Sequence, residues 1–307
     1  ILASIGADWG IKGPGENALP LLLDSLATPP PYGTVLDGWA AGFDADLTIA
    51  RGVDIDYRRY IAEGGIAGFQ TQKGCRGQCS YCGEANGTVT FRKPSRIVEE
   101  LASLVDKGIT DFHLCDTEFN QDLAFCKSFL TELIDSGLAI SWALYLKEQP
   151  HDTDLFRLIK KSGANLITVS VPTGNGSIEN LESLVASARD AGLRVAVDLL
   201  VGLPGDTADS IARRIDRFRT MNQRPDTVGI NATLRLYKNC AITDAILSSP
   251  DERRHCTGEI ENNPGFVRPV FYRAFDPETI RSIIGEDPLF KLEGFERTSN
   301  YQRLKND

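Results

Sequence analysis

Histidine, methionine and long hydrophobic runs are all scarce in this sequence. Its 307 residues include three histidines, which leaves little for acid–base catalysis that depends on imidazole. The longest apolar runs, such as residues 199–203, are much shorter than the ~20 residues of a membrane-spanning helix. No signal-peptide pattern opens the chain, so we expect a cytoplasmic protein without a membrane partner. The single methionine is Met221, and we therefore expect that Ile1 is not the native start.

Basic residues are also fewer than acidic residues. The chain has 33 Lys and Arg against 42 Asp and Glu, a formal net charge of -9. Nucleic-acid-binding proteins carry a basic surface, so this balance argues against a nucleic-acid partner and favours a small-molecule or peptide substrate. The seven cysteines are an odd number and three of them lie close together, which argues against the disulfide framework of a secreted protein.

The three close cysteines lie in the segment 70–83, QTQKGCRGQCSYCG, where Cys75, Cys79 and Cys82 have the spacing Cys-x3-Cys-x2-Cys. Such a loop suits three corners of a cubane iron–sulfur cluster, whose usual complement is four cysteines, and it leaves one iron open for a substrate or cofactor. A zinc site would need a fourth nearby ligand, and the nearest histidine, His113, lies beyond a predicted helix. Three buried structural thiols are the other alternative, although a glycine-rich, charged loop rarely buries them.

This spacing, with Tyr81 before the last cysteine, resembles the signature of the radical S-adenosylmethionine (radical SAM) enzymes. The resemblance implies a [4Fe-4S] cluster on Cys75, Cys79 and Cys82, with Tyr81 beside the cofactor. It also implies that the amine and carboxylate of S-adenosylmethionine bind the open iron. An electron from an external donor then cleaves the sulfonium and gives a 5'-deoxyadenosyl radical.

Downstream of the cysteines, apolar runs with strand character alternate with helices of period 3.6. Glycines follow three of the helices, at positions where a left-handed cap needs no Cβ: Gly137, Gly163 and Gly192. The repeats predict a parallel α/β sheet, either a partial (β/α)6 TIM-type barrel, which the resemblance favours, or a doubly wound open sheet. The expected strands are 68–71, 111–115, 140–146, 166–171, 194–201 and 227–234.

We expect three regions in the chain. Residues 1–66 are a linker or the end of an upstream domain, residues 67–240 form the barrel, and residues 241–307 form a C-terminal cap with a helix over 277–284. Within the first region, the GPGEN segment at 13–17 resembles the Gly-Glu-Gly-Glu element that ends the cobalamin-binding domain in one subgroup of radical SAM enzymes.

Candidate ligands follow the strands, because barrel chemistry occurs at strand C-terminal ends. After the second strand, the segment CDTEFN at 115–120 resembles the family motif that holds the amine of S-adenosylmethionine, in the Asp-rich form of the cobalamin subgroup. Glu118 is the first candidate and Asp116 the second. The alternative is that Asp116 or Thr117 caps the following helix.

Three further candidates lie within or at the ends of later strands. Ser170 offers a short hydrogen-bonding group for ribose or carboxylate contacts, although such a residue equally suits a turn. Asp198 is a carboxylate in an apolar run and needs a partner, and Asn231 alternates with apolar neighbours. In the next turn, Asp206 or Thr207 is expected to cap a helix.

Together these features predict a radical SAM enzyme that modifies a small molecule or peptide, with a cobalamin-type methyl transfer as the leading reaction. The GPGEN and DTEF segments both favour that subgroup, so cobalamin is a further candidate cofactor. The alternatives are a cobalamin-independent radical reaction, transfer of another S-adenosylmethionine fragment, and, from a different class, a non-catalytic metal-binding or electron-transfer protein.

Overall fold

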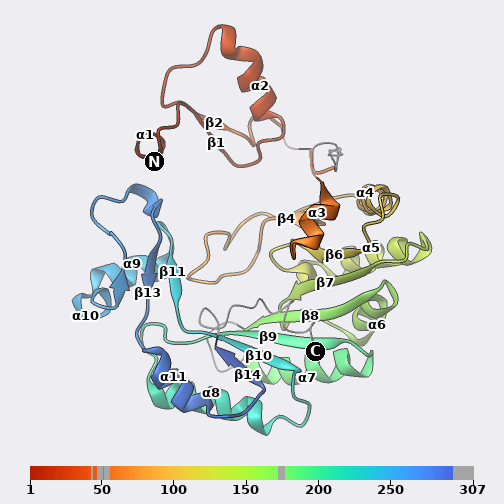
Figure 1. Ribbon diagram of the computed structural model, residues 1–307, viewed down its shortest axis with the longest axis vertical. Coiled ribbons are helices and arrows are strands. Elements are labelled where there is room, and N and C mark those ends of the chain that lie inside the picture. The colour runs from red at the N-terminus through yellow and green to blue at the C-terminus, as the bar shows by residue number, and fades with distance from the viewer. Residues whose placement is uncertain (43, 47–50, 52–55, 172–176, 293–307) are drawn as a thin grey trace.

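A computed structural model of the chain describes residues 1–42, 44–46, 51, 56–171 and 177–292. Its main element is one curved sheet of seven parallel strands in the order β14-β10-β9-β8-β7-β6-β3 (Figure 1). The strands are β3 (Ala67–Phe69), β6 (Asp111–Leu114), β7 (Ser141–Leu146), β8 (Ala164–Val171), β9 (Arg194–Leu200), β10 (Thr227–Asn231) and β14 (Phe290–Leu292).

The predicted parallel α/β sheet is thus confirmed. All six expected strands are present and pair in sequence order, and the described part of the chain shows no pairing between β3 and β14 that would close the barrel. Most boundaries agree to within two residues, and the largest error is in the last expected strand: it was expected to reach Leu234, whereas β10 ends at Asn231 and Leu234 begins another strand.

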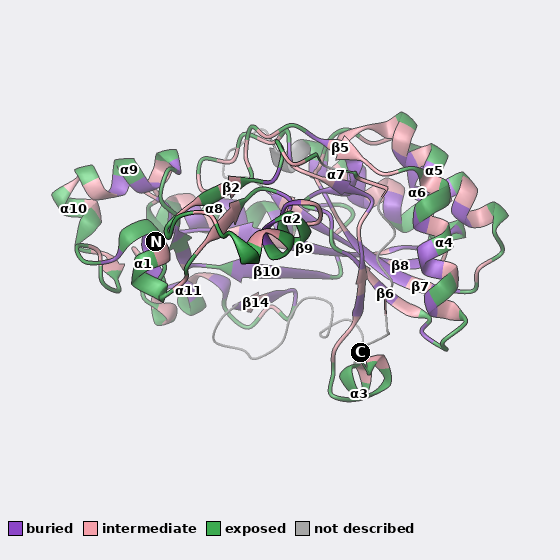
Figure 2. Cartoon of the chain, turned by 90° about the horizontal axis from the view of Figure 1, so that it is seen from above, coloured by how far each residue is buried: buried purple, intermediate pink, exposed green. Residues whose placement is uncertain are grey.

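Five helices connect the strands and cover the outer side of the sheet (Figures 1 and 2). Their apolar residues, such as Leu101, Phe129 and Ile215, are fully buried against the strands in one continuous core. The expected left-handed glycines follow three of them, with φ of 68° at Gly137 and 79° at Gly192. The helices are α4 (Pro94–Val105), α5 (Leu123–Asp135), α6 (Thr153–Lys161), α7 (Ser177–Asp190) and α8 (Ala208–Thr220).

The inner side of the sheet carries smaller residues. Ala143, Leu166 and Ala196 form a separate apolar cluster on neighbouring strands. Because side chains alternate between the two faces of a strand, the inner face continues through Tyr145 and Asp198 to the C-terminal strand ends. This alternation brings polar side chains to one end of the sheet.

The C-terminal region forms a second, antiparallel sheet in the order β11-β13-β12. It contains β11 (Leu234–Leu236), β12 (Cys256–Thr257) and β13 (Val270–Tyr272), with the helices α9 (Ala241–Ser248) and α10 (Pro250–Arg253) and the 3-10 helix η3 (Pro264–Phe266). The expected helix α11 (Pro277–Ile284) then packs on α8 and leads into β14 at the edge of the main sheet.

The first part of the N-terminal region, with α1, α2, β1 and β2, lies apart from the main sheet in Figure 1. It has a two-stranded parallel sheet, which joins β1 (Gly10–Lys12) to β2 (Val35–Asp37). The helical run expected through Leu26 is α2 (Ala18–Asp24) followed by the 3-10 helix η1 (Ser25–Ala27). Two further helices are α1 (Leu2–Ile5) and α3 (Tyr57–Ala62).

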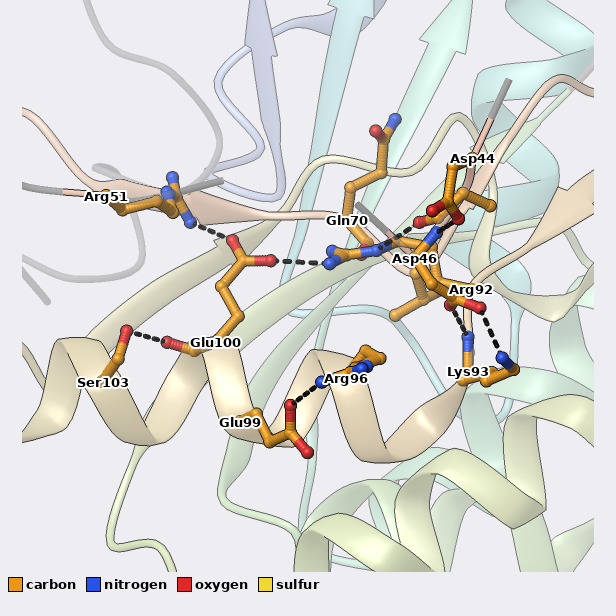
Figure 3. A network of polar contacts seen from close by, with 12 residues as sticks. Asp44, Asp46, Arg51, Gln70, Arg92, Lys93, Arg96, Glu99, Glu100 and Ser103 are labelled. Carbon is orange, nitrogen blue, oxygen red and sulfur yellow. Dashed lines mark hydrogen bonds and ion pairs between the residues drawn. The ribbon is translucent and has the colours of Figure 1, made fainter. Parts of the chain in front are cut away.

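Charged side chains attach the N-terminal region to the edge of the main sheet. Figure 3 shows Glu100 of α4 between two arginines, with Oε1 2.8 Å from Arg51 Nη1 and Oε2 2.9 Å from Arg92 Nη2. Arg92 also donates to the carbonyl oxygens of Gln70, at 2.8 Å, and Ala45, at 3.0 Å. Since β3 is an edge strand, these contacts protect an edge that would otherwise be open to other strands.

None of the helices in the described ranges combines the length and the apolar character that a membrane crossing requires.

Candidate functional site

The cysteine loop is closed at its base by a short antiparallel ladder between β4 (Gln72–Lys73) and β5 (Thr90–Phe91). Within the loop, the amide of Gly87 donates to Cys75 O at 2.8 Å, and the amide of Asn86 donates to Gly77 O at 2.7 Å. Gly74 begins the loop with φ of 91°, a left-handed conformation that favours glycine. These backbone contacts contribute to the shape of the loop.

The three predicted ligands are free thiols at the sheet's C-terminal end. Cys75 is buried and Cys79 and Cys82 are partly buried. The amide of Gly77 donates to Cys75 Sγ at 3.3 Å, and the amide of Glu84 donates to Cys82 Sγ at 3.4 Å. Hydrogen bonds to sulfur stabilise thiolate ligands and adjust the reduction potential of clusters, so the donor set fits an iron–sulfur cluster.

Burial raises the pKa of the Cys75 thiol. The described residues contain no group of three His, Cys, Asp or Glu side chains close enough to bind a single metal ion. A cluster holds its cysteines on different iron atoms, so its ligands can be spread more widely than those of one ion.

A cavity of about 950 Å³ lies beside this loop at the strand C-terminal ends. Tyr81 and Cys82 of the loop line it, together with three of the residues expected to bind the cofactor: Ser170, Asp198 and Asn231. Ser170 and Asp198 are directly paired in the ladder between β8 and β9. The structure thus brings together residues that are about 150 positions apart in the sequence, between 81 and 231.

Glu118 lies at the edge of this arrangement. Its Oε1 is 3.2 Å from Lys147 Nζ, which also donates to Ser170 O at 3.5 Å. Its Oε2 is buried and has no hydrogen-bond partner. Burial raises the pKa of Glu118 to about 7, although Lys147 and Ser170 favour the charged form. An acceptor of this kind suits an ammonium group.

Asp116 has a different environment. Its Oδ1 accepts from the amides of Thr71, at 2.7 Å, and Gln72, at 3.2 Å, and its Oδ2 accepts from the Thr71 hydroxyl. Burial raises the pKa of Asp116 to about 6, and these hydrogen bonds oppose the rise. Its carboxylate thus connects β6 to the strand that leads into the cysteine loop, and a cofactor contact by Asp116 stays a prediction.

The alternative role for Asp116 and Thr117 as helix caps is wrong. Helix α5 begins at Leu123, and the Asp122 carboxylate accepts from the amide of Phe125 at 2.9 Å. In the later turn, the expected cap is confirmed, because Thr207 caps α8 through the amide of Ser210 at 3.1 Å.

Sequence analysis did not identify several residues that line the cavity. Tyr145 reaches it from β7, and Arg235, Tyr237 and Phe271 reach it from the C-terminal sheet. The alternation Leu-Arg-Leu at 234–236 and Val-Phe-Tyr at 270–272 was a usable signal, because it predicts strands with one exposed position each. What the sequence did not indicate was that both exposed positions face the same cavity.

We expect Glu118→Gln to weaken S-adenosylmethionine binding while the iron content stays unchanged. The carboxylate provides a charge-assisted acceptor worth about 1.5 to 3 kcal/mol, or roughly a tenfold to hundredfold change in affinity. Isothermal titration calorimetry of the iron-loaded protein measures this. Glu63→Gln is the matched control, since Glu63 forms an exposed ion pair with Arg59 in α3. Equal affinity of the two variants would assign the role to another residue.

The curved parallel sheet, with a three-cysteine loop after its first strand, is the arrangement of a barrel-type protein with a metal-binding loop at the strand C-terminal ends. Residues 69–218 match the model of the Radical SAM superfamily, so this part of the chain is a radical SAM domain, as the cysteine spacing predicted.

Known proteins similar to this chain include cobalamin-dependent radical SAM methyltransferases. Tryptophan 2-C-methyltransferase from Streptomyces laurentii is 26% identical over 68% of the chain. The cobalamin-dependent radical SAM methyltransferase TokK from Streptomyces tokunonensis is 24% identical over 79% of the chain. The structure of TsrM from Kitasatospora setae with tryptophan and an S-adenosylmethionine analogue superposes with a TM-score of 0.69 and 25% identity, and covers 80% of the chain.

These alignments cover 39% and 35% of the two sequence relatives and 55% of TsrM. The chain therefore spans about half, or less, of the length of the proteins it matches.

Proposed function

We propose that this chain is the radical SAM part of a cobalamin-dependent methyltransferase that acts on a small molecule. The observation that carries the proposal is the shared cavity, where Cys82 of the cysteine loop meets Ser170, Asp198 and Asn231 at the strand ends. The [4Fe-4S] cluster, when bound by Cys75, Cys79 and Cys82, supplies the electron for S-adenosylmethionine chemistry. The similarity to TokK, whose name states its cobalamin dependence, supports the choice of subgroup.

The side chains around the cavity orient S-adenosylmethionine. The Oε2 of Glu118, which has no protein partner, accepts a hydrogen bond from the methionyl ammonium, and the ion pair with Lys147 favours the charged form of the carboxylate. Ser170 and Asn231 offer hydrogen bonds to the ribose or to the carboxylate, which are the contacts that the sequence suggested for Ser170. The site thus positions the cofactor, while the cofactors carry the difficult chemistry.

The N-terminal region, residues 1–66, connects this domain to the cobalamin-binding part of the protein. Parallel strands are normally covered on both faces. In the helix α2, beside the parallel β1–β2 pair, the apolar side chains of Leu21 and Leu23 are 58% and 54% exposed, so the described residues leave this apolar surface uncovered. Glu16 of the GPGEN segment lies 2.5 Å from Lys73, two residues before the first cysteine. The GPGEN segment is therefore close to the cysteine loop, which supports the proposed connection.

Product analysis tests the proposed reaction. The iron-loaded full-length protein, which includes the cobalamin-binding part, is expected to give S-adenosylhomocysteine with reductant, cobalamin and substrate, together with 5'-deoxyadenosine if a substrate hydrogen is abstracted. Liquid chromatography with mass spectrometry separates these from methylthioadenosine. Turnover without cobalamin, or methylthioadenosine as the main product, would contradict cobalamin-dependent methyl transfer and leave the radical SAM assignment intact. Iron loading without any S-adenosylmethionine binding would instead favour an electron-transfer protein.

A further inference from the structure

The C-terminal sheet presents a distinctive surface to the cavity. In β11, Leu234 and Leu236 are buried in the apolar core of this sheet, and Arg235 between them points to the opposite face. In β13, Val270 and Tyr272 are buried in the same core, and Phe271 between them is exposed. We call Arg235, Tyr237 and Phe271 the β11–β13 face.

The three side chains of the β11–β13 face lie together. Arg235 and Phe271 are direct partners in the antiparallel ladder, so their side chains are neighbours on one face. The Arg235 guanidinium lies 5.1 Å from the centre of the Tyr237 ring. Tyr237 and Phe271 are 44% and 38% exposed, and both line the cavity, where a ligand could cover them. Large aromatic surfaces of this kind gain free energy when a ligand covers them.

This face is held against the cysteine loop. The amide of Ile242, at the start of α9, donates to Ser80 O at 3.2 Å, and Tyr81 packs on the core of the C-terminal sheet. The cavity therefore has polar strand ends on one side and the β11–β13 face on another. At about 950 Å³ it is at the upper end of the range for small-molecule sites, which leaves room for a second molecule beside S-adenosylmethionine.

The charges in the cavity define the chemistry of that second molecule. Among the described residues that line it, Arg235 is the sole cation, whereas Glu84 and Asp198 are acidic. A guanidinium binds a carboxylate with two parallel hydrogen bonds, and the adjacent aromatic rings stack with a flat ring. We propose that the β11–β13 face binds the substrate of the proposed reaction, and that this substrate is an aromatic or heteroaromatic carboxylate.

Ligand binding tests this proposal independently of turnover. Iron-loaded protein with S-adenosylmethionine is titrated calorimetrically with L-tryptophan and L-phenylalanine, with tryptamine, which lacks the carboxylate, and with L-leucine, which lacks the ring. At least one of the two aromatic acids is expected to bind at least about tenfold more tightly than both tryptamine and L-leucine, because each of these loses one of the two contacts. No saturable binding of either aromatic acid, or equal binding of tryptamine, would overturn the proposal.

Variants then assign the contacts. Arg235→Gln is expected to reduce the affinity for the aromatic acid about tenfold and to leave tryptamine unaffected, whereas Phe271→Leu weakens both. The control is Arg254→Gln, since Arg254 is an exposed arginine of the same C-terminal region that lies outside the cavity. An unchanged affinity in Arg235→Gln would also overturn the proposal. The inference rests on the proposed function. Iron content is therefore measured on each sample: a sample without iron contradicts the proposed cluster, whereas a sample with iron that does not bind the aromatic acid contradicts the substrate proposal alone.

Discussion

Replacing Cys79 by alanine is expected to reduce the iron content of the anaerobically reconstituted protein to background. The cysteine loop provides three thiols, each of which would hold a different iron, so the loss of one would leave the cluster with two protein ligands. Equivalent losses are expected for Cys75→Ala and Cys82→Ala. Iron and sulfide analysis, with the broad visible absorbance of a cluster, measures the effect.

Cys126→Ala is the control for this loss. Cys126 is fully buried on α5, and its thiol donates to Phe119 O at 3.2 Å, away from the cavity. Its replacement removes core packing and is expected to cost about 1 kcal/mol of unfolding free energy, with iron content unchanged. A Cys79→Ala protein that loads iron fully would rule out Cys79 as a ligand, whatever the behaviour of the control.

The main sheet was predictable because its strands are buried on both faces. Parallel strands covered by helices consist of continuous apolar runs, and the run at 194–201 differs from the observed β9 by one residue. The glycines that follow three of the helices marked where those helices end. Short strands lack such signals: β14 has three residues, and its place beside β10 depends on how α11 packs on α8.

The site was predictable where a local rule applied. Cysteine spacing identified the loop, and polar positions in or after apolar strands identified Ser170, Asp198 and Asn231, which line the cavity. The same rules could not separate Asp116 from Glu118, which are two positions apart. The Asp116 carboxylate accepts hydrogen bonds from the amides of Thr71 and Gln72, about 45 residues earlier in the chain. Glu118 Oε2 has no hydrogen-bond partner. Only the three-dimensional arrangement distinguishes a carboxylate that supports the loop from one that can bind a ligand.

A second large effect is expected at Gly74, where alanine should disrupt the cysteine loop. Gly74 has φ of 91°, and a Cβ built there would lie 2.0 Å from the carbonyl oxygen of Thr88. That oxygen belongs to backbone just before β5, which pairs with β4, so it cannot move without opening the base of the loop. We expect Gly74→Ala to lower the unfolding free energy by more than about 3 kcal/mol and to reduce iron loading severely.

The matched comparison is Gly108→Ala. Gly108 has a similar φ of 82°, but a Cβ there would meet no atom within 4 Å. It therefore carries the cost of the left-handed backbone alone, about 1 to 2 kcal/mol, and its iron loading should be normal. Denaturant unfolding and iron analysis of both variants separate backbone strain from the clash with Thr88. Equal destabilisation of the two, with iron retained in both, would show that the close contact between Gly74 and Thr88 does not hold the loop in shape.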